Sequence, residues 1–211
     1  MSKNYFGYDR QILARICKST YEYEDQRQSK LIQLLGDRFT ILNEYSSRDI
    51  LTVLDNEHDK IIISFRGTDL ARDPHRAFTD LIADVNIAIG KNERVYRIQQ
   101  GEILIRNILL AGIPRSKLIL TGHSLGGFVG VNLGEKFNLP SVLFNIGSSP
   151  LDPKGVRRGL TNIVHITTNN LGVLPPVIDI LSVSALFLYR FPYTIVNVIK
   201  GLSKHTIDNF L

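Results

Sequence analysis

The five residues Gly122–Gly126 are the feature that most constrains how this chain folds. Their letters, GHSLG, fit the pattern G-x-S-x-G, and they stand between a predicted strand over 117–121 and a predicted helix over 124–137. A serine at so sharp a turn is held in a strained backbone, and glycines two positions before and after it remove side chains that would collide. We expect Ser124 to expose its hydroxyl above a sheet, at the positive end of the helix. The alternative is a glycine-rich turn with an incidental serine.

The rest of the chain alternates short apolar runs with helical patterns. Residues 10–35 predict two short helices with a solvated link, and residues 50–65 predict a β-hairpin. Further helices are predicted over 80–89 and 95–110, and further strands over 141–146 and 162–167. This alternation predicts an α/β fold, with a mostly parallel twisted sheet covered by helices on both faces. Ligand sites in such sheets lie beyond the carboxyl ends of the strands.

Composition narrows the class of protein. The chain has 211 residues, so we expect one domain over 1–211. Its 25 basic and 20 acidic residues leave a net charge of +5, a modest and dispersed excess that suits an anionic membrane surface. Because no basic and aromatic array accompanies it, we expect no nucleic-acid partner.

A single cysteine, Cys17, excludes internal disulfides and thiolate-pair metal sites. Residues 1–10 lack the apolar core of a signal peptide, which favours an intracellular location, with association to a membrane as a further expectation.

Three motifs together resemble one family. Residues 121–127, TGHSLGG, resemble the nucleophile turn of the class 3 lipases, which are carboxylic ester hydrolases. Residues 63–69, ISFRGTD, resemble their F-R-G-T segment, and residues 80–84, DLIAD, resemble their D-W-L-x-D stretch with Leu81 in place of the usual aromatic residue. Order and spacing agree over roughly residues 60–211.

The resemblance implies a specific fold and chemistry. It implies an α/β-hydrolase fold and a serine hydrolase that cleaves a lipid or small ester, an acylglycerol or a phospholipid, without metal or organic cofactor. It also implies that Thr68 and the backbone N–H of Leu125 stabilise the oxyanion that forms on the ester carbonyl. Thr68 is otherwise an ordinary strand-end threonine. We interpret Arg66 as a structural strand residue, solvated or ion-paired.

The catalytic base is predicted by elimination among five histidines. His123 adjoins the serine and must point away from it, and His58 falls in the predicted hairpin turn. His75 precedes the serine, and His165 lies in a strand ahead of any acid. Since α/β-hydrolases place their groups in the order serine, acid, histidine, His205 remains. Its imidazole titrates near neutrality and suits proton transfer; the alternative is a surface histidine near the C-terminus.

The acid is where the chain departs from the family. Counting back from Pro175 and Pro176, the family's acid position falls on Asn169. Asp179, within an apolar run, is the favoured substitute, because a charge in such a run generally has a partner. Asp152 and Asp208 are weaker candidates. Two alternatives stay open: Asn169 or a backbone carbonyl orients His205 in a slow enzyme, or the protein is a weak or inactive lipid-binding module that retains the fold.

An apolar segment separates the acid region from His205. Residues 171–189 approach the length of a membrane span, but two prolines, Gly172 and Asp179 argue against one. Pro192 divides the segment into two pieces. We expect buried helices or a helical, lid-like hairpin over about 171–202 that contacts lipid, with peripheral membrane contact as its consequence.

Overall fold

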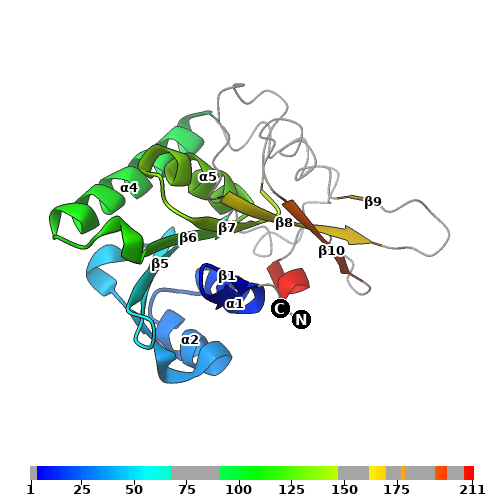
Figure 1. Cartoon of the computed structure of the whole chain (residues 1–211), viewed down its shortest axis with the longest axis horizontal. Coiled ribbons are helices and arrows are strands. Elements are labelled where there is room, and N and C mark those ends of the chain that lie inside the picture. Colours follow the sequence, from blue (N-terminus) through cyan, green and yellow to red (C-terminus); the bar gives the residue numbers. More distant parts are fainter. Residues whose placement is uncertain (1–3, 68–90, 147–161, 170–176, 179–192, 199–206) are drawn as a thin grey trace.

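The computed structural model describes residues 4–67, 91–146, 162–169, 177–178, 193–198 and 207–211. Within them, eight strands form one mixed sheet in the order β10-β8-β7-β6-β5-β4-β3, with β9 beside β8 (Figure 1). The strands of this sheet are β3 (Phe39–Ile41), β4 (Ile50–Asp55), β5 (Lys60–Phe65), β6 (Leu118–His123), β7 (Ser141–Phe144), β8 (Asn162–Asn169), β9 (Val177–Ile178) and β10 (Tyr193–Val198). A separate two-stranded ribbon pairs β1 (Asn4–Tyr5) with β2 (Tyr8–Asp9).

The sheet combines a parallel part with an antiparallel edge. Strands β5, β6, β7, β8 and β10 run parallel and adjacent in chain order. Strands β3 and β4 add antiparallel hairpins at one edge, where Asp55 pairs with Lys60 across the β4–β5 turn. The predicted mixed α/β architecture and the predicted hairpin are confirmed.

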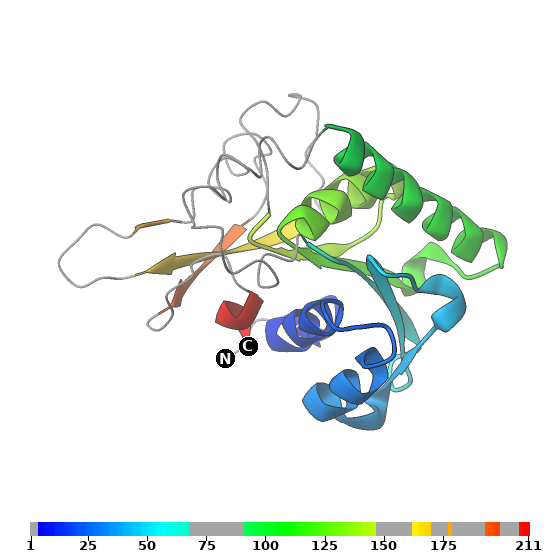
Figure 2. The same ribbon diagram turned by 180° about the vertical axis from the view of Figure 1, so that it is seen from behind.

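Helices cover both faces of the sheet, as predicted (Figures 1 and 2). The helices are α1 (Arg10–Ser19), α2 (Arg27–Leu35), α4 (Lys91–Leu110) and α5 (Leu125–Phe137), with 3₁₀ turns η1 (Gly36–Arg38), η2 (Asn43–Tyr45), η3 (Arg115–Lys117) and η4 (Ile207–Phe210). Alternate residues of β5 serve the two faces. Ile62 joins the core beneath α1, whereas Ile61 and Ile63 join the core beneath α4 and α5.

Helix α1 shows why the N-terminal segment docks on the sheet. Asp9 caps the helix by accepting a hydrogen bond from the Gln11 backbone N–H at 2.7 Å. Leu13, Ile16 and Cys17 then lie on one helical face and are at most 1% exposed. Each large apolar side chain buried in this way contributes about 1.5–3 kcal/mol of transfer free energy.

The predicted helical lid over 171–202 is wrong for the residues that the structure describes there. Tyr193–Val198 forms β10, which pairs in parallel with β8, and Val177–Ile178 forms β9. The physical reason is that most of β10 is β-branched, and such side chains favour extended backbone. Pro192, which we expected to break the segment, immediately precedes this strand. The rest of the segment and the predicted helix over 80–89 lie outside the described residues.

None of the helices in the described part of the chain combines the length and apolarity needed to cross a membrane.

Candidate functional site

Ser124 alone makes the turn from β6 to α5. Its backbone has φ 57° and ψ −123°, a conformation that non-glycine residues rarely adopt. A Cβ on Gly122 would lie 2.4 Å from the carbonyl oxygen of Gly126, and a Cβ on Gly126 would lie 1.9 Å from that of Phe65. Neither contact is sterically possible. The predicted strain at Ser124 and the predicted need for both glycines are confirmed.

The surroundings of Ser124 combine close packing with a helix N-terminus. The serine N–H donates to the carbonyl of Phe144 at 3.1 Å, and its side chain does not cap α5. Leu125 is the first residue of α5, so its N–H has no acceptor within the helix and lies at the positive end of the helix dipole. Ser124 is only 7% exposed, and the expectation of an exposed hydroxyl is wrong. The end of β5 approaches it closely: a Cβ on Gly67 would lie 3.0 Å from that of Ser124.

Tyr21, in the link between α1 and α2, also belongs to this site. Its hydroxyl oxygen accepts a hydrogen bond from the Gly67 N–H at 3.1 Å and lies 2.8 Å from Nδ1 of His123. The two rings meet edge to face at 6.0 Å. Sequence reasoning missed Tyr21, because no local pattern connects it with partners 46 and 102 positions away.

Arg66 supports Tyr21 rather than facing solvent. It is 6% exposed, and its guanidinium lies over the Tyr21 ring at 5.6 Å from the centroid. Its backbone carbonyl accepts a hydrogen bond from Arg97 at 2.8 Å. The structural role predicted for Arg66 fits these contacts. Of the two predicted alternatives, burial beneath the aromatic ring excludes a solvated side chain and leaves an ion-paired one open, and Arg66 follows β5 rather than lying within it.

A cavity of about 360 Å³ lies beside the carboxyl end of β5. Its lining includes Phe65, whose carbonyl contacts Gly126, and Val129 from the next turn of α5. Arg97 also lines it and forms an ion pair with Asp49 at 3.4 Å. The wall of this cavity is therefore partly apolar and partly ionic.

Only some of the remaining predicted site residues lie within the part of the chain that the structure describes. Thr68, Asp152, Asp179 and His205 lie outside the described residues. Asn169 is the last residue of β8, opposite Val198 of β10, and so stands at the carboxyl edge of the sheet. Asp208, a weaker candidate for the acid, forms an ion pair with Lys18 of α1 at 2.5 Å.

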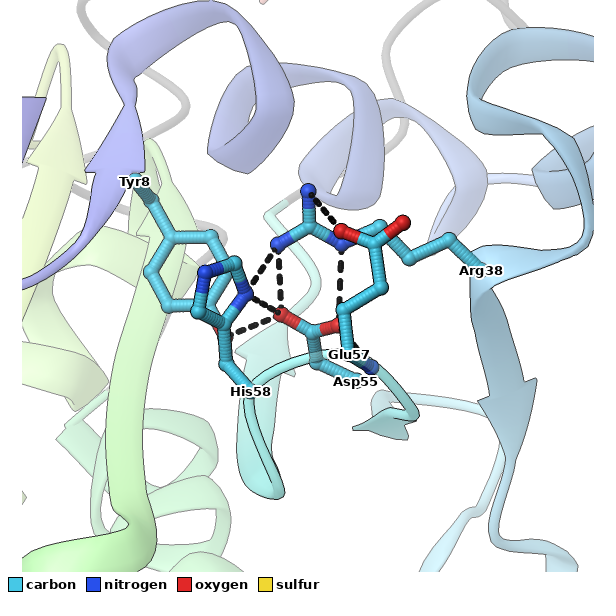
Figure 3. Close-up of polar contacts among 5 residues, drawn as sticks. All are labelled: Tyr8, Arg38, Asp55, Glu57 and His58. Carbon is cyan, nitrogen blue, oxygen red and sulfur yellow. Dashed lines mark hydrogen bonds and ion pairs between the residues drawn. The ribbon is translucent and has the colours of Figure 1, made fainter.

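A second polar cluster lies at the β4–β5 turn (Figure 3). Asp55, Glu57 and His58 offer ligand atoms within 4.8 Å of one another, the one such group found among the described residues. However, Arg38 already fills the centre of the cluster. Its guanidinium donates to both oxygens of Asp55 at 2.9 and 2.6 Å and pairs with Glu57 at 3.1 Å. Because Arg38 supplies the positive charge between these carboxylates, the arrangement is an ion-pair network rather than a metal centre.

The Asp55 carboxylate is fully enclosed and fully partnered. Its side chain is 0% exposed, and Tyr8 donates its hydroxyl to it at 2.6 Å. Burial alone would raise the pKa of Asp55, but hydrogen bonds from Arg38, Tyr8 and His58 outweigh burial and hold that pKa well below its ordinary value. Burial and the bond to Asp55 raise the pKa of Tyr8. Asp55 therefore remains ionised and serves stability rather than proton transfer.

No protein-family model and no curated protein matches the chain.

Proposed function

We propose that the protein is a serine carboxylic ester hydrolase with an α/β-hydrolase fold that resembles the class 3 lipases and cleaves lipid esters. The observation that carries the proposal is the backbone of Ser124, with φ 57° and ψ −123° between a parallel strand and a helix. A residue held in such a conformation is disfavoured by about 1–3 kcal/mol, and strain of this kind is concentrated at functional sites.

The surroundings of Ser124 support this proposal. A serine that served only packing or helix capping would gain nothing from a strained backbone, and Ser124 does not cap α5. The N–H of Leu125 stands one residue further on, at the positive end of the helix. The proposed nucleophile and the proposed oxyanion donor are therefore neighbouring residues, which suits the pairing that acyl transfer requires.

The proposed reaction proceeds in two steps. His205 removes the proton of the Ser124 hydroxyl, whose oxygen attacks the ester carbonyl, and the alcohol leaves with the proton held by His205. Thr68 and the Leu125 N–H stabilise the oxyanion. Water, deprotonated by His205, then attacks the acyl carbon. The bond to the Ser124 oxygen breaks, that oxygen takes the proton back from His205, and the carboxylic acid product leaves. Asp179 is proposed to orient His205, because Asn169 occupies the position of the family's acid.

Asn169 also favours a second candidate function. It stands at the carboxyl end of β8, where a carboxylate would be expected. Replacing the acid of a serine triad by its amide lowers kcat about 10⁴-fold in the best-studied example. A weak or inactive module that binds lipid at this edge of the sheet is therefore the alternative to an efficient enzyme.

The proposal is tested by hydrolysis of p-nitrophenyl esters from acetate to palmitate, together with labelling by a fluorophosphonate. Ser124→Ala should lower kcat at least about 10³-fold and abolish labelling. Ser116→Ala, an exposed serine in η3, is the matched control and should leave both unchanged. If the wild-type protein shows no ester hydrolysis that depends on Ser124, the proposed enzymatic activity is refuted.

The acid is assigned by two further variants in the same assay. Activity lost in Asp179→Asn would support Asp179. Activity unaffected by Asp179→Asn but raised by Asn169→Asp would place a weakened triad at Asn169. Binding to phospholipid vesicles that survives Ser124→Ala, without turnover of any ester, would favour the binding module.

A further inference from the structure

We infer that Tyr21 is a positioning residue that holds the end of β5 against the Ser124 turn and thereby fixes the oxyanion donors relative to the nucleophile. This inference rests on the proposed function and extends it to the N-terminal segment, which carries little of the family resemblance. It is carried by the contacts of the Tyr21 hydroxyl with Gly67 and His123.

Tyr21 is itself rigidly placed. The carbonyl of the preceding residue, Thr20, accepts a hydrogen bond from the buried guanidinium of Arg27 at 3.0 Å. The same guanidinium donates to the carbonyl of Ser47 at 2.6 Å, which joins the link between α1 and α2 to the loop before β4. The Thr20 hydroxyl lies 2.8 Å from that of Ser64 in β5. The residue before Tyr21 is thus anchored on the sheet beside the strand that ends at the site.

The Tyr21 hydroxyl joins two strand ends with one oxygen. The oxygen accepts the Gly67 N–H and also forms a hydrogen bond with Nδ1 of His123 at 2.8 Å, in which the tautomer of His123 decides which atom donates. Gly67 follows β5, and His123 is the last residue of β6. One hydroxyl therefore sets the separation of the chain ends that lead into the proposed oxyanion donor, Thr68, and into the nucleophile, Ser124.

The space around Gly67 shows how close this contact is. A Cβ there would lie 2.3 Å from the Tyr21 hydroxyl oxygen and 2.6 Å from the carbonyl oxygen of His123. Because glycine has no side chain, the backbone at residue 67 can approach the Tyr21 hydroxyl within hydrogen-bond distance. Errors of about 1 Å in the placement of catalytic groups lower rates as much as about 10²-fold, so this separation matters for turnover.

The decisive variant is Tyr21→Phe, which removes the hydroxyl and keeps the ring beneath Arg66. We expect kcat for p-nitrophenyl esters to fall about tenfold to hundredfold, with KM changed less than about twofold, because the misplaced donors act on the transition state. Tyr23→Phe, two residues on and 58% exposed, is the matched control and should match wild type in both constants.

A second measurement follows the contact itself and needs no activity. In the wild type, hydrogen exchange of the Gly67 amide should be slow, and in Tyr21→Phe it should be at least about tenfold faster. Rapid exchange of this amide in the wild type would overturn the inference even if Tyr21→Phe failed to fold.

The outcomes separate this inference from the proposed function. If wild type hydrolyses esters through Ser124 but folded Tyr21→Phe keeps its kcat, the positioning role is refuted and the proposed function stands. A variant that raises KM alone also refutes it, because that pattern indicates loss of ground-state binding. If wild type shows no turnover that depends on Ser124, the proposed function fails, and the catalytic role of Tyr21 falls with it.

Discussion

The two ends of the central strands each receive a tyrosine from the N-terminal segment, yet the tyrosines serve opposite purposes. At the β4–β5 turn, Tyr8 donates to Asp55, whose oxygens are saturated by Arg38 and neighbouring groups. At the carboxyl end of β5 and β6, Tyr21 contacts a backbone amide and an imidazole beside a strained serine. At the first end, the charges of Asp55 and Arg38 are paired with each other. At the second end, Ser124 has a strained backbone, and its hydroxyl stands beside the N-terminus of α5. The comparison indicates that the turn end stabilises the fold, whereas the chemistry that we propose belongs to the carboxyl end.

The largest expected effect on stability is at Gly126. Its Cβ would meet a backbone oxygen of Phe65 at 1.9 Å, so Gly126→Ala should separate α5 from β5 and lower the free energy of unfolding by at least about 3 kcal/mol. Gly36→Ala is the control: its Cβ meets open space, and the penalty comes only from its backbone at φ 73° and ψ −161°, about 1–3 kcal/mol. Urea denaturation measures both. Equal losses would show that close packing at the Ser124 turn is not essential.

The next effect is at the turn end. Asp55→Asn should lower the free energy of unfolding by about 3–5 kcal/mol, because it removes the buried charge opposite Arg38 and leaves that guanidinium with only the exposed Glu57 as a charged partner. Asp59→Asn, in the same turn but with a side chain 71% exposed, should change it by less than about 1 kcal/mol. Both proteins should retain any esterase activity while folded. A selective loss of activity in Asp55→Asn would break the division between the two ends.

The pH dependence of stability provides a further test of the role of Asp55 at the β4–β5 turn. Because the folded-state pKa of Asp55 is depressed below the unfolded value of 3.8, its contribution to stability is complete well above pH 3.8 and is lost as pH falls below it. The difference in unfolding free energy between wild type and Asp55→Asn should therefore be constant from pH 5 to 7 and narrow below pH 3.8. Denaturation curves across this range test the prediction, and a constant difference down to pH 2 would contradict it.

The smallest effect on stability is expected at Ser124 itself, with the opposite sign. Ser124→Gly relieves a backbone with positive φ and should raise the free energy of unfolding by about 1 kcal/mol while abolishing esterase activity. Ser116→Gly, in an unstrained and exposed position, should not stabilise the protein. A destabilised Ser124→Gly would show that the serine is retained for packing, and the contrast between the two ends would fail.

Local patterns predicted most elements because their causes are local. Apolar and β-branched runs on either side of a turn-rich stretch identified the β4–β5 hairpin, and helical periodicity identified α4 and α5 within a few residues. The strained turn at Ser124 was also predicted from the sequence, since its glycines are required by contacts within a few positions and by the adjacent strand. The 193–198 region was misread because an apolar run suits a buried strand as well as a helix. Only its pairing with β8 decides between the two.

The sequence by itself determined the alternation of strands and helices and the strained serine turn, because backbone propensity and short-range sterics act over a few residues. The tertiary structure alone decided which distant side chains complete each end of the sheet. Tyr8 lies 47 positions from Asp55, and Tyr21 lies 102 positions from His123. Such contacts depend on how α1 and its following link dock across the sheet, and that docking is set by buried apolar area, which acts without direction or regard for distance along the chain.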